Sequence, residues 1–518
     1  MSRYQLYPLF IVIAAAIMLG KIAAVDRVDV QQLQRYRLNQ VEPLLADKEK
    51  RLRKITDNEE QILAELERTR EKLIYDAVLQ SPMLCGNDRS RWATIRALVE
   101  PEMRVKDNDS AVWYAIDEVQ NIKGWDTIDM VKHPIESGGK EYLFSSKPPL
   151  LPTLMTIPYA AIYWGSGQTI SLGSHPYLVV RTMLVLFNFI PLCLCWILLI
   201  ALIEQFGTTD WGRIFAAAAV CFGTFLPAFA NTLNNHLPAV VAVAVAFYCF
   251  VKILHTTGCR LPVIHSFLAG VCAFFAVSCE LPALSFCVFL GGVLAWFARN
   301  LPAGGGAKRR IPAAYCLGIL VVAIPFFATN YIAHRTVRLA YSQRSWYFYE
   351  YERGGAVRDS YWKNPVGIDK GEPSRAEYIL HSTVGHHGIF LLTPVFLLSF
   401  YGLGIWISNK ESAVRRTAAV MILSLSIIVF MFYMMQKQPN RNYGGMTCAL
   451  RWMFWLVPLW LVPLVSAADK LSQCGTGRAA ALFLLGVSVF SCSYPVWNPW
   501  TMPWAYNLMY YFGIPVLL

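Results

Sequence analysis

Charged residues are scarce in this chain. Asp, Glu, Lys and Arg make up 15% of its 518 residues, whereas apolar residues make up 55%. A soluble globular protein carries about one quarter charged residues. The composition therefore excludes a soluble multidomain protein and places the chain in a lipid bilayer.

Paired cysteines are absent as well. None of the 13 cysteines forms a C-x-x-C pair, and most lie in apolar runs such as the one around Cys193 and Cys195, where Cys acts as a small hydrophobe. The sequence therefore indicates neither a zinc site nor a disulfide framework. A basic stripe interleaved with exposed aromatic residues is also lacking, so the net charge of +12 does not predict nucleic-acid binding.

Long apolar runs are what the chain has instead. About eleven of them are long enough to cross roughly 30 Å of hydrocarbon, and they predict an all-α polytopic membrane protein with an external helical loop domain. They begin near Tyr7, Leu178, Arg213, Leu237, Ile264, Pro282, Ile311, Ile389, Thr417, Trp452 and Ala479. Residues 1–25 have a weak n-region and no small-residue cleavage site, so we interpret them as an uncleaved anchor.

Positive charge indicates how these spans are oriented. If the N-terminus is cytoplasmic and the spans alternate, every short cytoplasmic loop is basic, as the positive-inside rule predicts. These loops hold Arg213, Lys252 with Arg260, Lys308 to Arg310, Lys410 with Arg415 and Arg416, and Lys470 with Arg478. Residues 150–164 are apolar but short, and counting them as a span would invert this pattern. We therefore predict an interfacial or re-entrant helix there, on the outer side.

Two polar motifs lie between the first and second spans. Asn87-Asp88-Arg89-Ser90-Arg91-Trp92-Ala93-Thr94-Ile95 places an acid before a basic and aromatic helical run. Tyr142-Leu143-Phe144-Ser145-Ser146-Lys147-Pro148-Pro149-Leu150 places a Lys-Pro-Pro turn before an apolar segment. In this order and spacing the motifs are more specific than either one alone.

These motifs resemble the first external loop of polytopic lipid-dependent glycosyltransferases of the protein O-mannosyltransferase and aminoarabinose transferase type, in the GT-C class. The fitting residues are Asp88, Arg91, Trp92, Ala93, Ile95, Tyr142, Lys147, Pro148, Pro149 and Leu150. The resemblance covers residues 87–181, and the other spans only by their layout. Two departures stand out: Arg89 replaces the second acid of an Asp-Glu pair, and a long insertion precedes the motif.

The resemblance implies transfer of a sugar from a polyprenyl-phosphate donor to a lipid, glycan or protein acceptor, on the external or periplasmic face of the cell membrane. Such a transfer needs a base for the acceptor hydroxyl and cations for the departing phosphate. Asp88 is the first candidate base, although it also fits a helix N-cap. Asp126 or Asp129 could supply the missing second carboxylate, although Asp126 also fits a turn cap. Whether a divalent metal takes part is left open.

Cationic and polar residues on the same side are candidates for substrate binding. Lys147 precedes two prolines that hold the backbone extended, which suits a lipid phosphate, although a snorkelling anchor fits too. In the resembling family an arginine at the start of the second span, here Arg181, binds phosphate or braces the loop acid. Arg91 belongs to the first motif. Arg441 and Arg451 flank a Gly-bearing turn that fits an oxyanion contact or a topology anchor.

Four more residues have both a functional and an ordinary interpretation. His236, at the end of the polar turn at residues 231–236, and Glu280 lie at outer helix ends, where they line a chamber or simply end helices. The tandem His386 and His387 in a glycine-bracketed turn suit phosphate or metal binding, but neighbouring residues seldom chelate one ion.

The sequence predicts the following division: 1–25 first transmembrane anchor, 26–80 external coiled-coil-like helical insertion, 81–177 external catalytic loop, 178–332 transmembrane bundle, 333–388 external loop and 389–518 C-terminal transmembrane bundle. A heptad seam runs through the insertion, and it fits either a homodimer or a hairpin packed on its own domain. The seam comprises Leu38, Val41, Leu45, Leu52, Ile55, Ile62, Leu66 and Leu73.

A non-catalytic protein is the alternative to the enzyme: a transporter, or an assembly partner that acts through its coiled-coil loop. A transporter needs polar groups near the midplanes of its spans, and the apolar runs here hold few. The loop motifs favour the enzyme.

Overall fold

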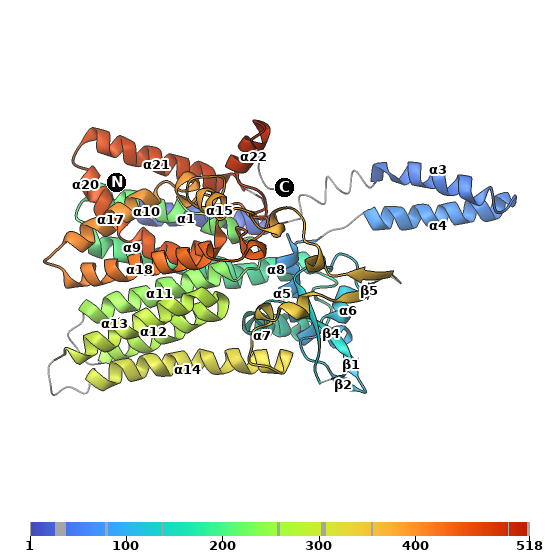
Figure 1. The fold of residues 1–518 in the computed structure, drawn as a ribbon, viewed down its shortest axis with the longest axis horizontal. Helices are drawn as coiled ribbons and strands as arrows, with labels where there is room; N and C mark the ends of the chain where they lie inside the picture. The colour runs from blue at the N-terminus through green and yellow to red at the C-terminus, as the bar shows by residue number, and fades with distance from the viewer. Residues whose placement is uncertain are drawn as a thin grey trace.

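The computed structural model describes residues 2–25, 38–77, 81–136, 138–255, 260–301, 307–353, 356–495 and 497–514. Within these ranges the chain is a polytopic bundle of apolar helices, and the predicted all-α membrane class is confirmed (Figure 1). Both ends of the predicted insertion, residues 26–37 and 78–80, lie outside the described residues, as does most of the loop between Lys252 and Arg260.

Nine helices in the described ranges are long and apolar enough to cross a membrane. They are built from α1 (Arg3–Ala23), α8 (Pro176–Leu184) continued through η2 (Val185–Phe189) into α9 (Ile190–Phe206), α10 (Asp210–Phe222) with η3 (Leu226–Phe229), α11 (His236–His255), α12 (Arg260–Cys279), η4 (Leu281–Ala283) with α13 (Leu284–Arg299), α14 (Ala307–His334), α18 (Ala413–Met434) and α21 (Gly475–Ser493).

A tenth span is bent. The 3-10 segment η10 (Arg451–Leu456) and α19 (Val457–Leu461) meet α20 (Leu464–Leu471) at an angle of 56°. The break falls at Pro463, whose ring removes a backbone hydrogen bond from the helix.

About eleven spans were predicted, and nine or ten in the described ranges are long and apolar enough to cross a membrane. The run predicted to begin near Ile389 is split into α16 (Ile389–Leu392) and α17 (Phe396–Ser408). The break comes at Thr393 and Pro394, because proline disfavours helical backbone in the residue before it. With 13 residues, α17 is about 20 Å long, which is short of roughly 30 Å of hydrocarbon.

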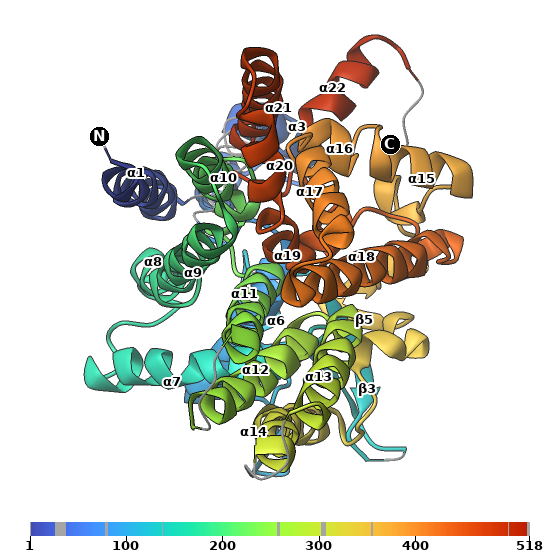
Figure 2. The same ribbon diagram turned by 90° about the vertical axis from the view of Figure 1, so that its left-hand side faces the viewer.

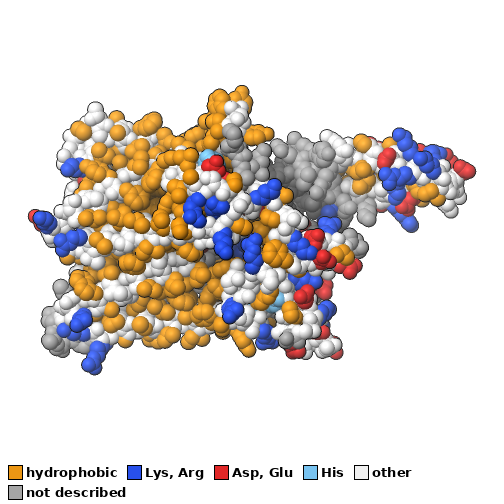
Figure 3. All heavy atoms as spheres, viewed as in Figure 1, with side chains coloured by type: hydrophobic (Ala, Val, Ile, Leu, Met, Phe, Trp, Pro, Cys, Tyr) orange, Lys and Arg blue, Asp and Glu red, His pale blue; other side chains and the backbone are white. Residues whose placement is uncertain are grey.

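The two ends of the bundle differ in charge. Hydrophobic side chains cover its flank; the end drawn on the left shows Lys and Arg with little Asp or Glu, whereas the opposite end shows both signs of charge (Figure 3). The end on the left, which we call the basic end, also holds the start of α1, α14 and α18 and the end of α20 (Figure 1). The opposite end, the loop end, carries the motifs at Asp88 and Lys147.

The loop end contains strands as well as helices, so the expected helical loop domain needs correction. Three two-stranded antiparallel sheets form there: β1 (Lys106–Asp107) with β2 (Ser110–Ala111), β3 (Met130–Pro134) with β4 (Glu141–Ser145), and β5 (Glu350–Arg353) with β6 (Ala356–Asp359). In the central sheet Met130 pairs with Ser145 and Pro134 with Glu141. Strands of two to five residues carry too little alternation to be recognised in a sequence.

Short helices complete the loop end. They are α5 (Gly86–Val99), η1 (Pro101–Met103), α6 (Asp117–Gln120), α7 (Leu150–Gly165), η5 (Ala340–Ser342), η6 (Arg344–Tyr347), η7 (Tyr361–Lys363), η8 (Gly367–Lys370), α15 (Arg375–Thr383), η9 (Gln438–Asn440) and α22 (Trp504–Tyr511). When the bundle is viewed from its basic end, α7 is seen lengthwise while α1 and α9 are seen end on (Figure 2). The helix predicted to be interfacial therefore crosses the direction of the spans.

Helices α3 (Val41–Leu52) and α4 (Glu59–Ala77) form a hairpin that projects from the loop end (Figure 1). Lys48 of α3 forms an ion pair with Glu65 of α4 at 2.7 Å. Of the predicted seam, Val41, Leu45 and Ile62 are buried, whereas Ile55 is 80% exposed. The seam thus packs one helix of this hairpin on the other in part, and association with a second copy stays a prediction.

Candidate functional site

Asp88 lies buried in the first turn of α5. The N-cap of this helix is Cys85, whose Sγ accepts a hydrogen bond from the backbone N–H of Asp88, so the alternative that Asp88 is the N-cap is wrong. Its Oδ2 accepts from Leu84 N at 3.1 Å and Thr232 Oγ1 at 3.0 Å, and its Oδ1 accepts from Leu233 N at 3.3 Å. The side chain is 1% exposed, and this burial raises the pKa of Asp88 to about 6.

Arg91, one turn further along α5, connects this helix to two other segments. Its guanidinium donates to Asn87 Oδ1 and to Asn235 Oδ1, both at 2.5 Å. The amide of Asn235 in turn donates to Glu280 Oε1 at 2.6 Å. Burial lowers the pKa of Arg91, although Asp129 and Asp88 oppose that shift. Arg91 and Glu280 therefore belong to one network.

That network continues from Glu280 to Arg451. Oε1 of Glu280 contacts Nδ1 of His236, and Nε2 of His236 lies 2.9 Å from Nη1 of Arg451. The guanidinium carbon of Arg451 stacks 4.7 Å above the ring of Trp500. The structure thus brings together His236, Glu280 and Arg451, which lie far apart in the sequence.

Trp500 closes the network into a ring. Its Nε1 donates to Thr232 Oγ1 at 3.1 Å, and Thr232 donates to Asp88. Asp88 and Arg91 on α5 are therefore connected both directly along the helix and through Thr232, Trp500, Arg451, His236, Glu280 and Asn235. A network of this kind holds its charged members in fixed positions.

Lys147 and Asp129 form an ion pair beside this ring. Asp129 immediately precedes β3 and Lys147 follows β4, so the pairing of Met130 with Ser145 brings them together. Their Nζ and Oδ1 atoms lie 2.6 Å apart, and the side chains are 21% and 12% exposed. Burial lowers the pKa of Lys147, and the positive charges of Arg91 and Arg451 lower it further.

Asp369, on η8, is a member of the site that the sequence did not single out. Its Oδ2 accepts a hydrogen bond from Tyr361 at 3.0 Å. Burial and then Asp129 raise the pKa of Asp369, whereas Arg451 and Lys147 oppose that shift. It therefore lies within electrostatic reach of both cations. Its place in the loop predicted at 333–388 was the signal that could have suggested it.

Thr232, Trp500 and Asn188 also belong to the site and were not predicted from the sequence. Thr232 lies in the polar turn at residues 231–236, which was noted only for His236. Asn188 is an amide inside an apolar span and is fully buried. A polar residue in such a span indicates function or helix packing, so it was the clearest overlooked signal.

Asp126, Arg181 and Arg441 are not linked to the ring in the same way. Asp126 is exposed, and its backbone carbonyl accepts from Arg89 Nε at 2.7 Å. Arg181 lies over the ring of Tyr177 at 5.1 Å, and its Nε is buried without a hydrogen-bond partner. The Nε atom of Arg441 is likewise buried without a partner. Their predicted roles in catalysis and binding stay predictions.

His386 and His387 form a separate buried pair. Nδ1 of His386 lies 2.6 Å from Nδ1 of His387, whose Nε2 donates to the carbonyl of Thr447 at 3.0 Å. His387 stacks on Tyr443 at 4.1 Å. Burial lowers the pKa of His386 to about 3, so the pair is uncharged.

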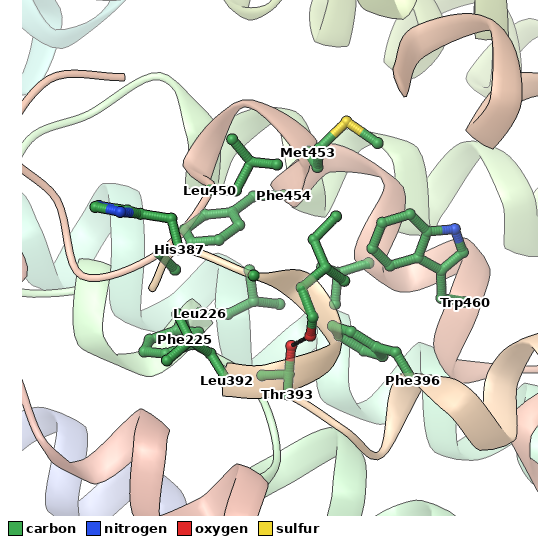
Figure 4. A pocket seen from close by; sticks show the side chains of 14 residues that line it. Phe225, Leu226, His387, Leu392, Thr393, Phe396, Leu450, Met453, Phe454 and Trp460 are labelled. Atoms are coloured by element: carbon green, nitrogen blue, oxygen red, sulfur yellow. Dashed lines mark hydrogen bonds between the residues drawn. The ribbon is translucent and has the colours of Figure 1, made fainter. Parts of the chain in front are cut away.

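A small cavity of about 20 Å³ lies against His387 and is otherwise mainly apolar, with Phe225, Phe396, Phe454 and Trp460 among its lining residues (Figure 4). That volume holds about one water molecule. Within the ranges that the structure describes, no group of three or more His, Cys, Asp or Glu side chains is placed to hold a metal ion.

No protein-family model matches the chain, and no curated protein matches it either. Among solved structures, the chain is similar to the apo form of the oligosaccharyltransferase from Archaeoglobus fulgidus, with 12% sequence identity and a TM-score of 0.44. The match covers 84% of this chain and 54% of the other, so the chain spans about half the length of that protein.

Proposed function

We propose that this chain is a membrane glycosyltransferase of the GT-C class, which transfers a sugar from a polyprenyl-phosphate donor to a hydroxyl group of a lipid, glycan or protein. One observation carries the proposal. A buried carboxyl group with a raised pKa, Asp88, is tied into one network with Arg91 and Arg451, and Lys147 lies beside it.

The cations suit the leaving group of such a reaction. Arg91 and Arg451 both act electrostatically on Lys147, and Arg451 also acts on Arg91. The three cations therefore lie in one region. Concentrated positive charge in a site that excludes water stabilises a phosphate as negative charge develops on it. Lys147 keeps 21% of its side chain exposed, so we assign it the first contact with the donor phosphate.

Asp88 suits the role of the base. An ionised carboxylate offers about four acceptor positions, of which Leu84 N, Thr232 Oγ1 and Leu233 N occupy three. The side chain of Trp92 also acts on this carboxylate, so the acceptor hydroxyl takes the remaining position when the indole moves aside. A pKa of about 6 leaves the group ionised at neutral pH and close to the value that favours proton transfer. Because Asp88 is 1% exposed, an acceptor reaches Oδ1 only after a neighbouring side chain moves.

The proposed transfer then proceeds as follows. The acceptor oxygen forms a bond to the anomeric carbon of the sugar while its proton passes to Asp88. The bond between that carbon and the phosphate oxygen breaks, and the electron pair leaves with the polyprenyl phosphate. The proton is released from Asp88 when the site reopens. Asp129 holds Lys147 in position through the 2.6 Å ion pair.

Charge also supports a location for the site. The short loops at the basic end hold Lys252 with Arg260, Lys308 to Arg310, and Arg415 with Arg416, and the positive-inside rule puts such an end in the cytoplasm. The loop end, with Asp88 and Lys147, then faces the external or periplasmic side of the cell membrane.

A transfer assay with a matched control tests the proposal. Asp117 is another carboxyl group whose pKa burial raises to about 6, and both of its oxygens accept from Leu143 N, outside the ring. We expect Asp88→Asn to abolish incorporation of labelled sugar from the membrane's polyprenyl-phosphate pool into product, and Asp117→Asn to retain it. Normal incorporation by Asp88→Asn would refute the assignment.

A further inference from the structure

The second span is not a continuous α-helix. Between α8 and α9 the residues Val185–Phe189 form a π-helical segment. Such one-turn insertions are rare and occur often at functional sites. Asn188 lies in this segment and is fully buried. An amide in a membrane span is costly unless its hydrogen bonds are made.

Both N–H groups of Asn188 are used on one non-helical loop. Nδ2 donates to the carbonyl oxygens of Ala230 and Thr232, each at 2.9 Å. The amide therefore binds two peptide units of the loop between η3 and α11. The amide of Asn234, on the loop itself, donates to Phe229 O and also to Thr232 O at 2.9 Å.

The loop that is held in this way is the one that holds Asp88. Thr232 directs its carbonyl to Asn188 and its hydroxyl to Oδ2 of Asp88. The next residue, Leu233, donates its backbone N–H to Oδ1. Two of the hydrogen bonds that Asp88 accepts, one from the Thr232 hydroxyl and one from the Leu233 backbone, thus come from residues at or next to the contact with Asn188.

We infer that Asn188 is a positioning residue for Asp88: the π-helical segment aims its amide at the 230–232 backbone, which presents Thr232 and Leu233 to the carboxylate. The catalytic meaning of this inference rests on the proposed function, but the positioning itself does not. Hydrogen bonds to a carboxylate favour its ionised form. Loosening the loop should therefore make Asp88 harder to ionise.

The largest influences on the ionisation of Asp88 are burial and hydrogen bonds. Cys85 and Arg91, both on its own segment, interact with it electrostatically. Thr232, Leu233 and Asn188 carry no charge. A change in the ionisation of Asp88 after substitution of Asn188 therefore reports on hydrogen bonding.

The test measures the apparent pKa of Asp88 in the full-length protein in detergent. For each variant, the pH dependence of the thermal unfolding midpoint is compared with that of the same variant carrying Asp88→Asn. We expect Asn188→Leu to raise this pKa by about 0.5 or more, and Thr232→Val to raise it by about 1, because a hydrogen bond to a charged group is lost. The double variant should shift it by less than the sum of the two single shifts, because both changes act on the hydrogen bond from Thr232, and Thr232→Ser should leave it unchanged.

Asn330 provides a matched control. It is a buried amide in α14 whose Nδ2 donates to Thr336 O and Arg338 O at 2.7 and 3.0 Å. Asn330→Leu should leave the pKa of Asp88 where it is. An unchanged pKa in Asn188→Leu, or equal shifts in Asn188→Leu and Asn330→Leu, would overturn the inference.

If Asn188→Leu does not fold, Asn188→Ser, whose short side chain cannot reach both carbonyls, takes its place with the same expected shift. Because the readout is a pKa and not sugar transfer, an active Asp88→Asn enzyme would refute the proposed function without affecting this measurement.

Discussion

Arg451 donates a hydrogen bond from Nη1 to Nε2 of His236 over 2.9 Å. A guanidinium can only donate, so Nε2 of His236 carries no proton and its ring is neutral. The ring proton is on Nδ1, which faces Glu280. The imidazole therefore connects a buried acid to a buried base and fixes the direction of each contact.

Replacement of His236 by Phe should destabilise the protein. The change keeps the ring volume but leaves Arg451 without this acceptor and Glu280 without this donor, and breaking a buried charged contact costs about 3 kcal/mol. The free energy of unfolding in mixed micelles measures the effect. His255→Phe, at the other end of α11, is the control because His255 is exposed, its hydrogen bond is to Val251 O of its own helix, and its edge contact with the ring of Phe206 can be kept by Phe; its expected effect is within about 0.5 kcal/mol. Equal losses in the two variants would contradict the assignment.

Asp88 should make stability and activity depend on pH near 6. Its folded-state pKa of about 6 is above the value of about 3.9 for a free Asp, so its contribution to stability is present at acidic pH and lost as the pH rises through about 6. Between pH 4 and 7 the stability of the wild type relative to Asp88→Asn should fall by roughly 2 to 3 kcal/mol. Asp117 titrates in both proteins, so its effect cancels.

Activity should change with pH in the opposite direction to stability. A base must be ionised, so transfer should decline below about pH 6. A pH profile of initial rates measures this decline. A rate that stays constant from pH 7 to 5 would show that Asp88 is not the base.

Binding of the donor phosphate should depend on Lys147 and Arg451. Lys147→Ala and Arg451→Gln should each weaken binding of a short-chain polyprenyl phosphate by about 2 kcal/mol, or about 30-fold. The double variant should lose less than the sum, because both cations act on one anion. Equilibrium binding to the purified variants decides this, and strict additivity would contradict it. The same measurement on Arg181→Ala tests the expectation, drawn from the sequence, that Arg181 also contacts this phosphate.

A native cysteine can report the orientation in the membrane. Cys474 is exposed at the basic end, and hydrogen bonds with Thr476 and the backbone of Gly477 lower its pKa, which makes the thiol reactive. In intact cells it should be protected from an impermeant thiol reagent, whereas a cysteine placed at the exposed Lys106 should be labelled. Cys316→Ser removes the other exposed thiol among the described residues. The reverse labelling pattern would refute the proposed topology.

The spans could be predicted from the sequence because apolar length and loop charge are local properties. The split at Thr393 and Pro394 was visible only as a proline in an apolar run, and such a proline can bend a helix or end it. The three short sheets could not be foreseen, since pairs such as Lys106 with Ala111 depend on loop packing.

The site was predictable only in part for the same reason. Asp88 and Lys147 lie in motifs whose spacing could be compared with a known family. Thr232 contacts Asp88 across 144 residues, and Trp500 contacts Thr232 across 268. Such contacts arise when the spans pack together. No periodicity or composition along the chain indicates which loop meets which.

The lipids that copurify with the protein test the central claim most directly. Native mass spectrometry in a mild detergent should find a polyprenyl-phosphate-linked sugar on the wild type and more of it on Asp88→Asn, because that variant binds the donor without transferring the sugar. Lys147→Ala should carry less. Bulk phospholipids alone on all of these proteins, including Asp88→Asn, would contradict the assignment of a polyprenyl-phosphate donor.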